Sequence, residues 1–211
     1  MMFYEPPKND HGLPYNPFKA LVAPRPIGWV TTMSLAGAVN LSPYSYFNAF
    51  SDRPDIVGFS SSGHKDALVF AEEGREFVCN LATWDLRDAM NATSAPLPRG
   101  QSELDFAGLT PAPSRLVRPP RVAESPVALE CRWLTTLPLK PLNGEAKYHL
   151  VLGEVVGVHI DDRFIRDGVV DTAAMRPIAR AGYREYFVAT PETLFRMGRP
   201  PGGGDQGPPA G

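Results

Sequence analysis

The sequence predicts a mainly β protein, an antiparallel barrel decorated by short helices. Several runs are rich in β-branched and aromatic residues and end at turn residues, a pattern typical of strands. Two later runs are long, and the second of them is apolar on both faces, as expected for a strand of a small closed barrel. The chain also has 23 prolines among 211 residues. Proline interrupts helices, so its abundance argues against a helical bundle.

The first part of the chain predicts four of these strands and two helices. The strands are expected at residues 26–33, across 39–50 with an interruption at Pro43, at 55–60 and at 76–83. Residues 66–73 are good helix formers and precede Gly74, the expected C-terminal stop. A second short helix is expected over residues 86–92, with Asp85 as its N-cap.

The later part of the chain predicts a long loop and two long strands. Residues 94–120 are rich in proline and are expected to be mostly loop. The strands are expected at residues 127–137 and 146–160. We expect residues 1–198 to form a single domain. Residues 199–211 are rich in glycine and proline and have almost no apolar side chains, which predicts a disordered tail.

Composition limits the kind of partner. The formal net charge is -2, so no basic excess points to nucleic acid or to an acidic membrane surface. No apolar run approaches the roughly 20 residues that span a bilayer, and the first residues lack the pattern of a signal peptide. Cys79 and Cys131 lie in apolar, strand-like runs and are expected to be buried thiols. Together these features predict a cytoplasmic protein.

The stretch FSSSGHKDAL, residues 59–68, combines three hydroxyls, a glycine and a lysine where a strand passes into a helix. The first amides of a helix and the positive end of its dipole favour an anion. The stretch is therefore a candidate phosphate site, although it lacks the ending of a P-loop. The alternative is a helix N-cap made by a serine, with Lys65 solvated.

Two further clusters are candidates for ligand binding. Residues 40–48, NLSPYSYFN, place small polar and aromatic groups where a strand should pack. They suit a flat heterocycle with polar edges, or an irregular strand with a satisfied polar network. Residues 176–183, RPIARAGY, present two arginines on a turn that could reach a phosphate or a ring, or could be an ordinary surface turn.

Other chemistries find no support in the sequence. His11, His64, His149 and His159 lack metal-ligand spacing, so no metal is expected; His149 and His159 are expected to be strand histidines with one hydrogen bond each. A Gly-x-Ser-x-Gly elbow and a Rossmann-type glycine motif are both absent, which disfavours a hydrolase and a Rossmann dinucleotide site.

Taken together, the ordered segments over residues 24–183 resemble the flavin reductase-like family of FMN-binding split-barrel proteins. The resemblance is carried by PRPI at residues 24–27, NLSPYSYFN at 40–48, KD at 65–66, EFVCNL at 76–81, NATSAP at 91–96 and RPIAR at 176–180. Where many relatives have a hydroxyl residue after the Lys-Asp pair, this chain has Ala67.

The resemblance implies a homodimer of six-stranded antiparallel split barrels with Greek-key topology that binds FMN non-covalently near the subunit interface. Residues 30–32 and 45–48 would line the isoalloxazine, residues 60–62 with Lys65 and the amide of Asp66 would take the phosphate, and Arg180 would approach the flavin, in cis or across the dimer. The implied cofactor-binding residues are Arg25, Val30, Thr31, Thr32, Ser45, Tyr46, Phe47, Asn48, Ser60, Ser61, Ser62, Lys65, Asp66 and Arg180.

The implied activity is an NAD(P)H-dependent flavin reductase that transfers hydride from a nicotinamide to FMN. The absence of an acid-base constellation fits this activity, because the cofactor carries the redox chemistry and the protein supplies orientation and electrostatics. A monooxygenase or another electron acceptor would then receive the electrons. Two alternatives stay open: a flavin-binding electron carrier without a nicotinamide site, and an FMN enzyme that acts on a bound small organic molecule.

Overall fold

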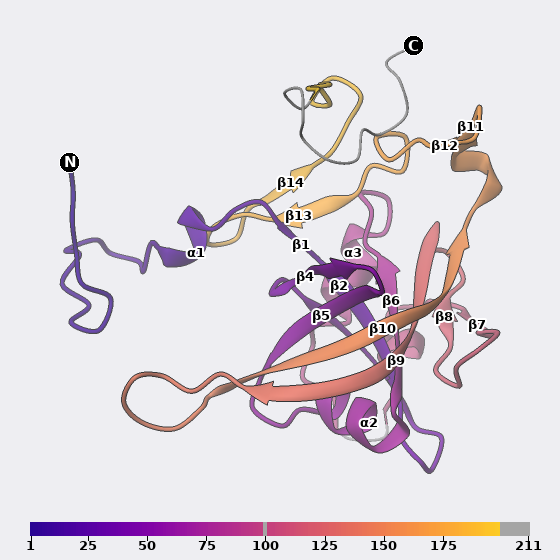
Figure 1. The fold of residues 1–211 in the computed structure, drawn as a ribbon, viewed down its shortest axis with the longest axis horizontal. Coiled ribbons are helices and arrows are strands. Elements are labelled where there is room, and N and C mark those ends of the chain that lie inside the picture. Colours follow the sequence, from indigo (N-terminus) through magenta and orange to yellow (C-terminus); the bar gives the residue numbers. More distant parts are fainter. Residues whose placement is uncertain (99–100, 199–211) are drawn as a thin grey trace.

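The computed structural model describes residues 1–98 and 101–198 and is organised around one seven-stranded antiparallel sheet that curls into a barrel (Figure 1). The strand order is β3-β2-β6-β9-β10-β5-β4. The strands are β2 (Gly28–Met33), β3 (Val39–Tyr44), β4 (Phe47–Asp52), β5 (Asp55–Ser62), β6 (Glu76–Leu81), β9 (Val127–Pro138) and β10 (Tyr148–Ile160). The predicted mainly β, antiparallel fold is confirmed.

The seventh strand arises because residues 39–50 form two strands, and the break falls at Ser45 and Tyr46. The prediction of an interruption at Pro43 was wrong. Pro43 lies within β3, opposite Trp29 of β2. Because β3 is an edge strand, a residue without an N–H group is tolerated there.

Short helices decorate the barrel, as predicted. They are α1 (Phe18–Leu21), α2 (Asp66–Gly74), α3 (Arg87–Ala92), α4 (Glu103–Phe106) and a 3-10 turn at Asp162–Phe164. Helix α2 packs on the barrel through Ala67, Leu68, Phe70 and Ala71, which are all buried.

Helix α2 stops at Gly74, as predicted, whereas the predicted N-cap of the second helix was wrong. The left-handed residue after α2 is Arg75, with φ 61°, and Gly74 is the last helical residue. A side chain at Gly74 would crowd the carbonyl oxygen of Met33 at 3.0 Å. Arg75 is held in place by its guanidinium, which stacks 3.6 Å from the ring centroid of Trp133. Helix α3 begins one residue later than expected, and its N-cap is Leu86, not Asp85.

The core of the barrel contains Phe59, Phe77 and Val151, each fully buried, together with both cysteines. Cys79 and Cys131 are free and buried, as predicted. The two thiols are nevertheless neighbours, and burial followed by the hydrogen bond with Cys79 raises the pKa of the Cys131 thiol well above its ordinary value. Buried neutral thiols of this kind are unreactive.

Smaller sheets extend the barrel at its ends. β1 (Arg25–Pro26), β13 (Ile178–Arg180) and β14 (Tyr186–Val188) form a three-stranded sheet, and the pairs β7 (Pro111–Ala112) with β8 (Arg121–Val122) and β11 (Ile165–Arg166) with β12 (Val169–Val170) form two-stranded ones. Figure 1 shows that the N-terminal arm with α1 and the loop joining β9 to β10 project to the same side of the barrel. The predicted tail at residues 199–211 lies outside the described residues.

No helix in the described part of the chain is long and apolar enough to cross a membrane.

Candidate functional site

The outer face of β4, β5 and β10 brings together two of the predicted clusters. In antiparallel strands, directly opposed residues point to the same face. Ser60 lies opposite Leu150, and Ser62 lies opposite Tyr148. The amide of Ser60 donates a 2.8 Å hydrogen bond to the carbonyl oxygen of Tyr46, which fixes the turn before β4 against the end of β5.

A cavity of about 1090 Å³ opens on this face, and we call it the barrel-face cavity. Six of the predicted cofactor-binding residues line it: Arg25, Ser45, Tyr46, Phe47, Asn48 and Ser60. Its remaining walls come from the N-terminal arm and from the loop between β9 and β10, including Phe18, Val22, Leu139, Glu145, Lys147 and Tyr148. The structure therefore places two clusters that are distant in sequence around one space.

At the end of β5, the three predicted serines differ in burial and in hydrogen bonding. The hydroxyl of Ser60 is buried and has no hydrogen-bond partner among the described residues. Ser61 is fully buried, and its hydroxyl donates to the carbonyl oxygen of Gly63 at 3.2 Å. Ser62 is exposed. Only Ser60 lines the barrel-face cavity.

The N-terminus of α2 follows directly. Its N-cap is Lys65, whose side chain is exposed and does not cap the helix, so the alternative of a serine cap is not realised. Asp66 begins the first turn, and Ala67 points into the barrel core with 1% of its surface exposed. A hydroxyl at Ala67 would therefore be directed toward the core.

Two residues that the sequence analysis did not connect with this phosphate-site candidate, Lys147 and His149, lie beside it. The amide of Gly63 donates to the carbonyl oxygen of Lys147 at 3.0 Å. The rings of His64 and His149 lie 4.6 Å apart, and the buried Nδ1 of His149 has no hydrogen-bond partner among the described residues. The missing signal is the strand register, which places His149 opposite Ser61. The other strand histidine, His159, does make a hydrogen bond, to Glu130.

Three predicted residues lie inside the wall of the barrel. Val30, Thr31 and Thr32 on β2 are fully buried, and none of them lines the barrel-face cavity. The hydroxyl of Thr31 accepts a 2.9 Å hydrogen bond from the side-chain amide of Asn80. The Thr32 hydroxyl has no partner among the described residues.

Arg25, in β1 at the edge of the barrel-face cavity, connects the N-terminal arm with the segment that follows β13. Its guanidinium donates to the carbonyl oxygens of Lys19 and Val22 in the N-terminal arm and, at 2.8 Å, to that of Ala181 after β13. It exposes 6% of its surface, and its Nε has no hydrogen-bond partner in the described part of the chain. Arg25 therefore positions the arm and still has one buried donor to offer.

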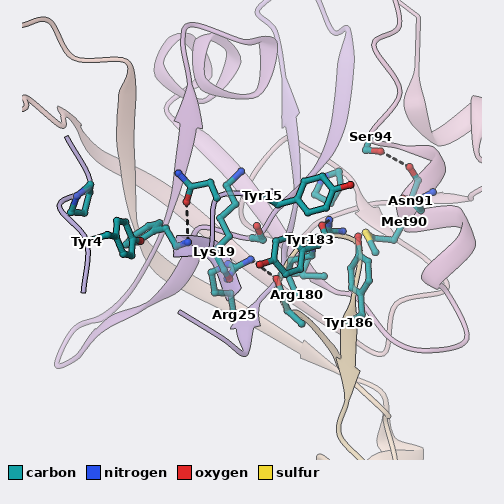
Figure 2. Close-up of a pocket in the computed structure, with 17 residues that line it drawn as sticks. Tyr4, Tyr15, Lys19, Arg25, Met90, Asn91, Ser94, Arg180, Tyr183 and Tyr186 are labelled. Carbon is teal, nitrogen blue, oxygen red and sulfur yellow. Dashed lines mark hydrogen bonds between the residues drawn. The ribbon is translucent and has the colours of Figure 1, made fainter. Parts of the chain in front are cut away.

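Arg180 lies elsewhere, in a second cavity of about 1080 Å³ that we call the tyrosine cavity because Tyr4, Tyr15, Tyr183 and Tyr186 line it (Figure 2). The guanidinium of Arg180 donates to the carbonyl oxygen of Tyr183 at 2.5 Å and lies 4.5 Å from the ring centroid of Tyr186. The two cavities share Phe18, Arg25 and Ser45, so they lie side by side.

The phenols beside the barrel-face cavity remain protonated at neutral pH. Burial raises the pKa of Tyr44 to about 12, although a hydrogen bond with Ser61 acts in the opposite direction. Burial, followed by the neighbouring Tyr148, also raises the pKa of Tyr46. The rings of Tyr46 and Tyr148 meet edge to face at 5.9 Å. Both phenols can therefore donate hydrogen bonds. The described residues contain no cluster of three or more His, Cys, Asp or Glu side chains suited to a metal.

The curled antiparallel barrel, with a mainly apolar cavity on its outer face, has the fold of the FMN-binding split-barrel proteins. The chain belongs to the flavin reductase like family, whose domain matches residues 21–173.

Individual similar proteins agree with this assignment. The chain is 38% identical to the uncharacterized protein BH2278 of Halalkalibacterium halodurans over 78% of this chain and 81% of that protein. The solved structure of nitrilotriacetate monooxygenase component B from Bacillus cereus is similar with a TM-score of 0.85 and 28% identity, covering 93% of this chain and 98% of that one. The structure of 2-nitrobenzoate 2-nitroreductase from Pseudomonas fluorescens is similar with a TM-score of 0.78 and 26% identity, covering 90% and 92%.

The residues present fit a flavin mononucleotide. Ser60 offers a buried, unpartnered hydroxyl and lies at the end of the barrel-face cavity next to α2. A polar group buried without a partner costs free energy, which a bound phosphate or ribityl oxygen would recover. The other end offers the flat surfaces and polar edges of residues 45–48, and Arg25 Nε supplies a further buried donor.

Proposed function

We propose that this protein binds FMN in the barrel-face cavity and catalyses its reduction by NAD(P)H. The observation that carries the proposal is the unpartnered, buried hydroxyl of Ser60 in the same cavity as residues 45–48. Ser60 would donate to the phosphate end of the ligand, with Lys65 and Lys147 supplying positive charge around it. Ser45 and Asn48 would bond the polar edge of the ring, and Tyr46 and Phe47 would contact its face.

When bound, FMN supplies the redox chemistry, by accepting hydride from the nicotinamide. The protein's own groups orient the two molecules and control the local charge. Arg25, buried and positively charged, lies where it would favour an electron-rich ring by electrostatic attraction. Glu145 also lines the cavity, opposite in charge to Arg25 and Lys147. The geometry gives no side chain an acid-base role in hydride transfer.

The direct test is nicotinamide oxidation. The purified chain with FMN should consume NADH or NADPH, measured by loss of absorbance at saturating flavin, and a Ser60→Ala variant should need more FMN for the same rate. Consumption of neither nicotinamide would refute the reductase assignment. FMN that stays tightly bound and is reduced by dithionite or a protein donor, but not by either nicotinamide, would identify an electron carrier.

A second protein is proposed as the acceptor of the electrons. Support comes from the similarity to a protein described as the component B of a monooxygenase, at 28% identity. Release of reduced FMN would require a cavity open to solvent, and the cavity has exposed apolar side chains at its rim, among them Phe18, Val22, Phe50 and Leu139. Stoichiometric transfer to an oxygenase in a coupled assay would support this proposal.

We also propose that the protein is a homodimer in which a second copy covers that apolar rim. Leu142, at the tip of the loop between β9 and β10, is fully exposed, and Leu137 and Leu139 expose 45% and 47% of their surfaces. Large exposed apolar patches beside a binding site are typical of subunit interfaces. Light scattering should give about twice the chain mass of 23.0 kDa. Leu142→Glu should shift the protein toward a monomer, whereas the distant Leu194→Glu should not.

A further inference from the structure

The tyrosine cavity contains aromatic rings that the fold does not bury. Tyr15 exposes 72% of its surface, Tyr183 50% and Tyr186 40%. The rings of Tyr15 and Tyr183 meet edge to face, with centroids 5.9 Å apart, although one belongs to the N-terminal arm and the other follows β13. Figure 2 shows the side chains of Tyr15, Tyr183 and Tyr186 gathered on the side of Asn91. Such open rings offer surfaces on which another flat ring can stack.

The backbone beneath these rings is held in an unusual conformation. Tyr183 has φ 48°, in the left-handed region that side-chain-bearing residues seldom adopt. Arg180 bonds the carbonyl oxygen of the same residue and lies over the ring of Tyr186. Strain of this kind costs about 1–3 kcal/mol and tends to occur at ligand-binding positions.

The charge of the tyrosine cavity has a single sign. Of the residues that the structure describes, Lys19, Arg25 and Arg180 line it, and no aspartate or glutamate does. Among the described residues, none of the three cations forms an ion pair with a carboxylate, and the hydrogen bonds of both arginines go to backbone carbonyl oxygens. Positive charges gathered at a partly desolvated site without a counter-charge favour an anionic ligand.

We propose that the tyrosine cavity binds a planar aromatic carboxylate. A guanidinium matches a carboxylate with two parallel hydrogen bonds, and Arg180 has donors beyond the one given to Tyr183. The aromatic ring of the ligand would stack among Tyr15, Tyr183 and Tyr186, whose hydroxyls would bond its polar substituents.

The surroundings suit a carboxylate better than a dinucleotide. Pyrophosphate groups are usually held by glycine-rich loops and by the N-terminal amides of helices. No glycine within residues 1–98 and 101–198 lines the tyrosine cavity, and α3 contributes Met90 and Asn91 from its C-terminal half. The groups that can contact an anion in this cavity are therefore the charged side chains, and their arrangement suits a single carboxylate better than a pyrophosphate.

The position of the site connects it to the proposed flavin site without depending on it. Phe18, Arg25 and Ser45 line both cavities. A carboxylate bound beside Arg180 would thus lie next to the ring end of the barrel-face cavity, the place for an organic substrate or an effector of flavin reduction. Binding itself requires no flavin, so it can fail or succeed separately from the reductase activity.

The test is calorimetric titration of the full chain with benzoate, as purified and after addition of FMN. Benzamide, which has the same ring without the charge, and acetate, which has the charge without the ring, are the matched ligands. We expect benzoate to bind at least about tenfold more tightly than either. Arg180→Gln should weaken benzoate about ten- to hundredfold, because a charge-assisted bidentate pair is lost.

Tyr186→Leu serves as a second variant, since it removes a ring and keeps the cations. It should weaken benzoate and benzamide alike. Equal affinity for benzoate and benzamide, or benzoate binding that ignores both substitutions, would overturn the proposal. Displacement of benzoate by NADPH, with Arg180→Gln weakening the two equally, would assign the cavity to the nicotinamide and overturn it as well.

Discussion

The barrel-face cavity and the tyrosine cavity have nearly equal volumes, about 1090 and about 1080 Å³, but they are built from different kinds of chain segment. The first rests on strands β4, β5 and β10, whose backbones are locked in a continuous ladder. The second rests on the N-terminal arm, the end of α3 and the turn between β13 and β14. The barrel strands form a rigid wall for one ligand. The segments of the other site are joined by the pairing of β1 with β13, by the contact of Tyr15 with Tyr183 and by a clamp, the hydrogen bonds of Arg25.

The first test of this comparison is a substitution that destabilises the barrel at a residue far from both cavities. Glu130 is fully buried and accepts hydrogen bonds from the amides of Arg115 (2.7 Å), Leu116 (2.6 Å) and Val117 (3.1 Å), and from His159 Nε2 at 2.5 Å. Glu130→Gln should lower the free energy of unfolding by about 2–3 kcal/mol, because charge-assisted bonds are lost. Urea denaturation measures this change. Both FMN and benzoate affinities should stay unchanged in the folded variant, and a loss of either would show that the barrel transmits strain to the sites.

Glu130 also makes the free energy of unfolding depend on pH. Burial alone would raise the pKa of Glu130, but the hydrogen bond from His159 and those from the Arg115 and Leu116 amides outweigh it and hold the pKa below its ordinary value. The unfolded chain then binds more protons, so this contribution is complete above the ordinary glutamate pKa of about 4.3 and is lost as the pH falls through the folded value. Unfolding free energies measured from pH 5 downward should therefore fall less steeply for Glu130→Gln than for the natural chain.

A second substitution, at Gly28, tests whether the packing of the barrel supports the barrel-face cavity. A Cβ atom on Gly28 would lie 2.4 Å from Cδ2 of Phe47, so the ring must move. Gly28→Ala should cost about 1–3 kcal/mol of stability through overpacking and weaken FMN, because Phe47 lines the barrel-face cavity. Benzoate affinity should change little. Gly198→Ala is the matched control, since none of the described residues lies within 4 Å of its Cβ position. A benzoate loss as large as the FMN loss would contradict the separation of the two sites.

The difference between the cavities also explains what the sequence could reveal. Residues 45–48 and 60–62 are contiguous motifs, so local patterns were enough to single out each as a candidate, and the family resemblance implied that both lie beside one flavin. The neighbourhood of His64 and His149 depends on the register of β5 with β10, which local periodicity cannot supply. The tyrosine cavity depends on contacts such as Arg25 with Ala181, 156 residues apart, and no local pattern encodes those. Arg180 was recognised as a ligand-binding candidate, but its surroundings could be read only from the fold.

A third change should loosen the tyrosine cavity selectively. Lysine at position 25 keeps the charge but cannot reach the carbonyl oxygens of Lys19, Val22 and Ala181 at once. Arg25→Lys should cost about 1–2 kcal/mol and speed proteolytic cleavage before residue 22, measured by mass spectrometry of timed digests. Benzoate should weaken more than FMN. Arg163→Lys is a suitable control, because Arg163 pairs with Asp161 at the surface, away from both cavities. If the N-terminal arm were cleaved at the same rate in Arg25→Lys as in the natural chain, Arg25 would not be what holds the arm in place.

The smallest expected effect is the most specific to the barrel-face cavity. Lys65 is exposed at the N-terminus of α2, where it would face the phosphate of FMN but no part of riboflavin. An exposed charge pair contributes at most about 1 kcal/mol, so Lys65→Ala should weaken FMN about fivefold and leave riboflavin unchanged in fluorescence-quench titrations. The difference should shrink as salt is added, because exposed charges are screened. Lys140→Ala, an exposed lysine outside both cavities, should affect neither ligand. Equal losses for FMN and riboflavin would mean that Lys65 acts on the fold of the loop, and the phosphate would then have to be sought beside Lys147 and the histidine pair.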